Sequence, residues 1–149
     1  MVELVPTLLR QELARLAEDD LRLDGRGRWE GREVSLETDC LYNAEGSAKV
    51  VMGDTIVYAG IKFELRTPWP DRPTQGSLMC GAELRPVAHR KYEPGPPSPQ
   101  SIELGRVVDR GIRESGCIDM ESLCIVPGEK VWGVMIDIHV LSDGGNIFD

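Results

Sequence analysis

The 149-residue chain has few aromatic residues and lacks the long apolar segments of membrane proteins. Phe, Trp and Tyr make up only 5% of the sequence, so a core must be built mainly from Leu, Val, Ile and Ala. No run of about 18 apolar residues occurs, and the beginning of the chain lacks a signal-peptide pattern. We therefore expect a cytoplasmic protein that neither spans nor binds a membrane.

The sequence also lacks the motifs of the common catalytic and metal sites. There is no GxxxxGKS/T loop, no GxSxG turn, no HExxH helix and no EF-hand loop, and no nucleophile–base pair is evident. Asp137, Asp143 and Asp149 offer an acidic cluster at most. A strand aspartate that faces solvent or pairs with an arginine is the simpler interpretation of Asp137, and Asp143 belongs to a turn. We assign no catalytic residue, no metal ligand and no cofactor.

Four cysteines are present, but their spacing does not suit a zinc site. Cys40, Cys80, Cys117 and Cys124 form no CxxC pair, and the closest two are separated by six residues. Each lies in or beside an apolar segment, which favours buried and reduced side chains. A metal site and a disulfide are the alternatives.

The chain has more acidic than basic residues. The formal net charge is −8 and the sequence pI is about 4.8. This excludes a broadly basic nucleic-acid coat, because such a coat needs a positive surface, but it allows a small basic channel on an acidic body. The length fits one domain, preceded by a helical arm over residues 1–22.

Hydrophobic periodicity predicts helix, four strands, helix and two strands. This order indicates an α+β fold with a mixed or mostly antiparallel sheet, a helix packed on one face and an N-terminal helix. The expected elements are a helix over residues 7–21, strands over 34–39, 47–52, 56–65 and 78–87, a helix that begins at Ser98 and Pro99 and ends at Gly116, and strands over 123–126 and 131–141.

The second helix is the most distinctive segment, because it carries a row of arginines. Arg106, Arg110 and Arg113 follow at i, i+4 and i+7, within about 60° of one another around the axis. A row of planar guanidinium groups suits phosphate oxygens. The apolar residues expected on the opposite side, toward a core, are Leu104, Val107, Val108 and Ile112.

An ordinary solvated helix face explains the same arginines. Glu103, Asp109 and Glu114 are close enough along the helix to pair with them. Spacing alone therefore leaves both an anion site and a solvated polar face open.

Several strings from about Leu23 to Asp149 resemble the ribonuclease PH family. They are LDGR, AEGSAKVVMGDTIVYAGIKFEL, GAELRPV, YEPGPP, IELGRVVDRGIRES and PGEKVWGVMIDIHVLSDGGNIFD. AEGSA followed by GDT is similar across the whole family. YEPGPP and VVDRGIRES are more similar to the non-catalytic ring subunit of archaeal exosomes than to its catalytic paralogue.

The resemblance implies a non-catalytic subunit of a phosphorolytic 3′–5′ exoribonuclease ring that acts in RNA degradation and processing. In such a hexameric ring the partner is the catalytic paralogue, and single-stranded RNA passes through the pore. Arg106 and Arg110 match the RNA-binding arginines of the family helix, and Arg113 follows by its geometry. Arg72, in a proline-rich loop, would face the pore.

Complete members of the family continue with a second, related half after the DGGN string. The resemblance therefore implies that residues 23–149 are a truncated, N-terminal half-domain without the phosphate loop and catalytic aspartate of the paralogue. The alternative function is a half-domain that self-associates, for example as a homodimer, without RNA or ring function.

Overall fold

The structure, a computed structural model, describes residues 5–148. Contacts between Cα atoms divide it into two compact units, of which the first ends at Arg32 and the second begins at Glu33. Among residues 5–148, no helix is both long enough and apolar enough to cross a membrane.

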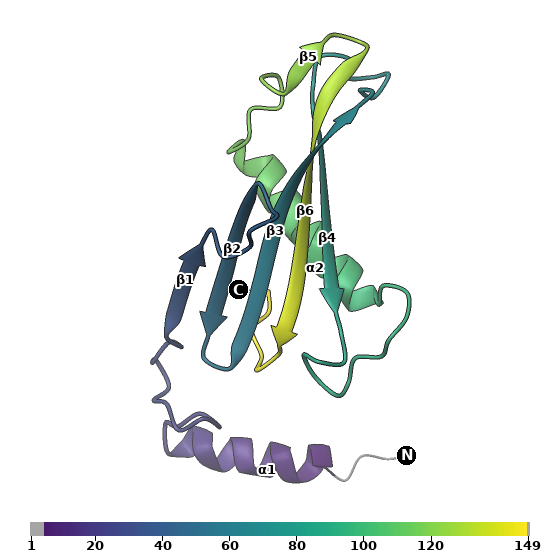
Figure 1. Cartoon of the computed structure of the whole chain (residues 1–149). Helices are drawn as coiled ribbons and strands as arrows, with labels where there is room; N and C mark the ends of the chain where they lie inside the picture. Colours follow the sequence, from purple (N-terminus) through teal and green to yellow (C-terminus); the bar gives the residue numbers. More distant parts are fainter. Residues whose placement is uncertain (1–4, 149) are drawn as a thin grey trace. The chain divides into compact units, whose positions relative to one another are not determined.

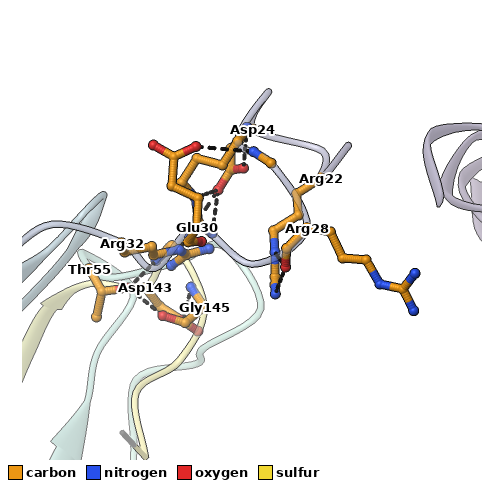
Figure 2. A network of polar contacts seen from close by, with 11 residues as sticks. Arg22, Asp24, Arg28, Glu30, Arg32, Thr55, Asp143 and Gly145 are labelled. Atoms are coloured by element: carbon orange, nitrogen blue, oxygen red, sulfur yellow. Dashed lines mark hydrogen bonds and ion pairs between the residues drawn. The ribbon is translucent and has the colours of Figure 1, made fainter. Parts of the chain in front are cut away.

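The first unit contains helix α1 (Val5–Glu18) and a short arginine-rich loop. The helix ends a few residues before the expected position. In the loop, Arg22 donates hydrogen bonds to the carbonyl oxygen of Arg28 (Figure 2). Arg26 pairs with Asp24 at 2.8 Å. The basic side chains of this loop are therefore engaged in holding its own turns.

The second unit is built on a six-stranded sheet. Its strands are β1 (Val34–Thr38), β2 (Gly46–Met52), β3 (Thr55–Arg66), β4 (Ser77–Leu84), β5 (Cys124–Val126) and β6 (Lys130–Ser142). They lie in the order β1-β2-β3-β6-β4, and β5 pairs with β6. Only the β4–β6 pair is parallel. The mostly antiparallel α+β fold predicted from the sequence is confirmed, with β6 in the interior of the sheet (Figure 1).

Helix α2 (Pro99–Ser115) packs on one face of this sheet (Figure 1). The side chain of Ser98 accepts a hydrogen bond from the amide of Ser101, and Pro99 fills the first turn, where its missing N–H does no harm. Gly116 ends the helix in the left-handed conformation, with φ of 64°. Both ends of the helix therefore lie where the sequence predicts them.

Strand alternation decides which face of the sheet forms the core. The inward residues of β6 alternate with exposed Asp137 and His139, and Leu104 of α2 packs against them with 3% of its surface exposed. The apolar residues of β4 and β6 that form this core are Leu78, Ala82, Leu84, Val134, Ile136, Ile138 and Val140. The packing of α2 on them leaves its opposite face in solvent.

Candidate nucleic-acid interface

The solvent-facing side of α2 forms a shallow hollow of about 870 Å³. All of its lining comes from this one helix, which makes it an open surface rather than an enclosed pocket. The lining residues are Pro99, Ile102, Glu103, Arg106, Val107, Arg110, Gly111 and Glu114. Two of the three arginines predicted from the sequence therefore lie on one exposed surface.

Arg106 and Arg110 have no partner within the described part of the chain. Both side chains are exposed, and neither makes a hydrogen bond or an ion pair with any residue from 5 to 148. Glu103 and Glu114 line the same hollow without pairing with them. At 1.5 Å per residue, the two arginines are about 6 Å apart along the helix axis. Their guanidinium donors are thus available to an external anion.

Arg113 differs from the other two arginines, because its donors are already in use. Its Nε and Nη2 atoms each lie 2.9 Å from a carboxylate oxygen of Asp109. Nη2 also donates to the carbonyl oxygen of Leu78 in β4 at 2.7 Å. The hydrogen bond to Asp109 raises the pKa of Arg113. The sequence grouped three equivalent arginines, whereas the structure leaves two unpaired and fastens the third.

Val107 was expected to face the core, and this expectation is wrong. Its side chain is 50% exposed and lines the hollow with Ile102, which is 51% exposed. The inward positions near it are taken by Ser101 and Gly105, whose small size lets the helix approach β4 closely. At about 100° per residue Val107 lies only about 60° around the axis from Arg110, so the helix geometry itself places it at the edge of the exposed face.

Asp137 and Asp143, two of the acidic residues considered from the sequence, do not line this surface. Asp137 is exposed and alternates along β6 with core residues, so it lies on the sheet face away from α2. Asp143 lies in the turn after β6, and Asp149 lies outside the described residues. Among residues 5–148, no group of three or more His, Cys, Asp or Glu side chains is placed to hold a metal ion.

Arg72 lies in the loop between β3 and β4. Its Nε atom is 3.8 Å from a carboxylate oxygen of Asp71. The same loop contacts the segment before β6, because Gly128 donates its amide to the carbonyl oxygen of Pro73 at 2.8 Å. The hydrogen bonds of this loop thus connect it to the β5 end of the sheet rather than to α2.

The cysteines are less buried than their apolar surroundings suggested. Cys117, just after α2, is exposed, whereas Cys40, Cys80 and Cys124 are half-buried. All four are free thiols. Burial, with added repulsion from Asp109 and Asp137, raises the pKa of Cys80 to about 11.

Comparison with known proteins places this fold in the ribonuclease PH class. The family described as "3′ exoribonuclease family, domain 1" matches residues 30–149. The chain therefore belongs to the 3′ exoribonuclease family, and the resemblance seen in its sequence is confirmed. The matched region includes the whole sheet and α2.

Curated relatives are similar over the full chain. It is 49% identical over 149 residues to the exosome complex component Rrp42 of Methanosarcina mazei, covering 100% of this chain and 56% of that protein. It is 45% identical over 146 residues to the same component of Sulfurisphaera tokodaii, covering 97% and 53%. The chain thus spans about half the length of the curated relatives it matches.

Solved structures extend the similarity to three dimensions. A chain of the Archaeoglobus fulgidus exosome with RNA bound to the active site superposes with a TM-score of 0.93 at 46% identity, covering 99% of this chain and 58% of that one. A chain of an archaeal exosome core superposes with a TM-score of 0.83 at 43% identity, covering 96% and 53%.

Proposed function

We propose that the chain is a non-catalytic, RNA-binding and structural subunit of a cytoplasmic phosphorolytic 3′–5′ exoribonuclease ring. The observation that carries this proposal is the pair of unpaired arginines, Arg106 and Arg110, on the exposed face of α2. The similarity to exosome components supports it independently. The non-catalytic part rests on the YEPGPP and VVDRGIRES strings, which resemble the non-catalytic ring subunit.

Two guanidinium groups one turn apart suit the backbone of single-stranded RNA. Each planar fork donates paired hydrogen bonds to phosphate oxygens and stays charged at every working pH. Contacts of this kind give affinity without reading bases, as an exonuclease that processes any RNA requires. In this proposal Arg106 and Arg110 hold the phosphates, and Arg113 contributes less, because Asp109 and Leu78 already occupy its donors.

RNA binding is tested by fluorescence anisotropy with a labelled single-stranded oligo(A). Reversing both charges, Arg106→Glu with Arg110→Glu, should weaken binding about 100-fold, because two charge-assisted hydrogen-bonding groups are lost. The salt dependence should fall as well, by about 0.7 in slope for each lost phosphate contact. Arg10→Glu with Arg15→Glu on α1 changes the net charge equally and serves as the control. Equal affinities for the wild type and the α2 variant would contradict the proposal.

Ring membership is tested by light scattering after size exclusion. The chain is measured alone and mixed with a catalytic paralogue of the same family. A mixed assembly of six subunits is expected from the proposal. A homodimer that ignores the paralogue would instead support the alternative, a half-domain that self-associates without ring function.

A further inference from the structure

Helix α2 is fastened to the sheet near both of its ends by hydrogen bonds to β4. The hydroxyl group of Ser101, in the first turn, donates to the carbonyl oxygen of Ala82 at 2.8 Å, and this contact is buried. Near the last turn, Arg113 donates to the carbonyl oxygen of Leu78 at 2.7 Å. Because β4 is the last strand of the sheet order, these bonds join the helix to an edge strand.

Between the two contacts the helix backbone lies directly on β4. A Cβ atom at Gly105 would lie 3.2 Å from the carbonyl oxygen of Cys80 and 3.4 Å from the amide nitrogen of Ala82. Only a glycine allows this approach without displacement. The close approach at Gly105 and the two polar contacts together fix the distance between the helix and the strand.

Asp109 holds Arg113 in the orientation that reaches β4. It lies one turn earlier on the same helix and binds the guanidinium through both carboxylate oxygens at 2.9 Å. Such a two-point pair fixes the plane of the fork, which leaves Nη2 directed at Leu78. A lysine at this position would have a compact ammonium group without the planar fork, so it could not reproduce both contacts in the same geometry.

We infer that Arg113 is a positioning residue, which fixes the C-terminal half of α2 against β4 and thereby holds Arg106 and Arg110 in place for an anionic ligand. This inference rests on the proposed function. The last turn of a helix is short of backbone hydrogen bonds. Here the Gly116 amide donates to the carbonyl oxygen of Arg113, and the Arg113 side chain ties the turn to β4. Arg110 lies only three residues before Arg113, so fraying at Arg113 would loosen it directly.

Two substitutions separate positioning from direct contact with RNA. Arg113→Lys keeps the positive charge but loses the fork, and Ser101→Ala changes a buried, uncharged residue that cannot reach RNA. We expect each to weaken oligo(A) binding by up to about tenfold, the limit reached if the whole free energy of one lost hydrogen bond to a charged or buried group must be supplied on binding. Ser115→Ala is the matched control, because the Ser115 hydroxyl donates to the carbonyl oxygen of Ile112 and accepts from the amide of Cys117, and neither bond reaches β4. Wild-type affinity in Arg113→Lys and Ser101→Ala would overturn the inference.

A spectroscopic measurement distinguishes the three arginines in the intact chain. The Nε–H resonances of Arg106 and Arg110 should shift when oligo(A) is added, and that of Arg113, which donates to Asp109, should not. A shift at Arg113 as large as that at Arg106 would show direct contact and overturn the inference.

Hydrogen exchange in the free protein tests the attachment of α2 to β4 independently of RNA binding. Without RNA, Arg113→Gln and Asp109→Asn should speed amide exchange in residues 110–116 of α2, whereas Arg106→Gln should not. If the wild type fails to bind oligo(A), the proposed function fails. The attachment of α2 is then still judged by exchange, and unchanged protection in Arg113→Gln would refute it.

Discussion

The ammonium group of Lys91 lies 2.6 Å from a carboxylate oxygen of Asp143. The same oxygen accepts a hydrogen bond from the hydroxyl of Tyr92 at 2.6 Å, and the other oxygen accepts one from the amide of Gly145 at 3.0 Å. The Asp143 side chain is only 4% exposed. One carboxylate therefore joins the loop that leads into α2 to the turn that follows β6, part of which is drawn in Figure 2.

This contact makes stability depend on pH in the acid range. Burial alone would raise the pKa of Asp143, but hydrogen bonds from Lys91, Tyr92 and the Gly145 amide outweigh it and lower the pKa to about 2. A carboxylate with a lowered pKa stabilises the fold fully above its unfolded pKa, near 4, and loses that contribution as pH falls toward 2. The expected loss is about 2 kcal/mol. Urea unfolding of the wild type and of Asp143→Asn from pH 6 to pH 2 measures it.

The difference in unfolding free energy between the wild type and Asp143→Asn reports on Asp143 alone. Other carboxylates with lowered pKa values, such as Asp24 and Glu45, are present in both proteins and cancel. The stability gap should be widest near pH 6 and should close toward pH 2. A gap that stays constant across this range would show that the charge on Asp143 does not contribute.

Removing the hydroxyl of Tyr92 tests the same contact from the other side. Tyr92 is 7% exposed, and Tyr92→Phe keeps its ring in the core while deleting the hydrogen bond to Asp143 and the interaction of the hydroxyl with Lys91. Because Lys91 and Gly145 still hold the carboxylate, we expect a loss of about 1 kcal/mol. The measurement is the free energy of unfolding at pH 7, and Tyr42→Phe, at a fully exposed tyrosine, should change it by less than about 0.5 kcal/mol.

The thiols should react at very different rates. At pH 8 a disulfide reagent should modify exposed Cys117 first, whereas Cys80, whose pKa is raised to about 11, has almost no thiolate and should react slowly. Cys117→Ser should remove the fast phase, and Cys80→Ser should leave it unchanged. A fast phase that disappears in Cys80→Ser would mean that β4 opens readily.

The helices and strands were predicted well because their boundaries are set by a few neighbouring residues. The turn at Gly53 and Asp54, the cap at Ser98 and the left-handed Gly116 mark boundaries through their own backbone chemistry. The parallel pairing of β4 with β6 is different, since it depends on how the chain returns after α2. A helix between two neighbouring strands permits a parallel pair, but alternation within a strand does not show which neighbour it takes.

Those features of the candidate site that depend on spacing within α2 were also predictable from the sequence. Helical spacing correctly placed Arg106 and Arg110 on an exposed face, and the pairing of Arg113 with Asp109 follows from their i, i+4 separation. The bond from Arg113 to Leu78 crosses 35 positions in the chain, so no local pattern reveals it. Val107 was misplaced because it was grouped with the other apolar residues, although helical geometry puts it about 60° from Arg110 and about 100° from Val108 around the axis.

Two glycines of α2 offer a matched test of that close approach. Both should gain about 1 kcal/mol of helix propensity when changed to Ala. At Gly111 nothing lies within 4 Å of the new Cβ atom, so Gly111→Ala should realise this gain. At Gly105 the new atom meets the backbone of Cys80 and Ala82, which cannot rotate away, so the helix must move from β4.

We therefore expect Gly105→Ala to be less stable than Gly111→Ala by about 1–3 kcal/mol, the usual cost of overpacking a close contact. Urea unfolding at pH 7 measures the difference. Oligo(A) binding adds a second readout, because a displaced α2 carries Arg106 and Arg110 with it and should bind more weakly. Equal stabilities would mean that the helix can shift without strain, and that the contacts of Ser101 and Arg113 alone set its position.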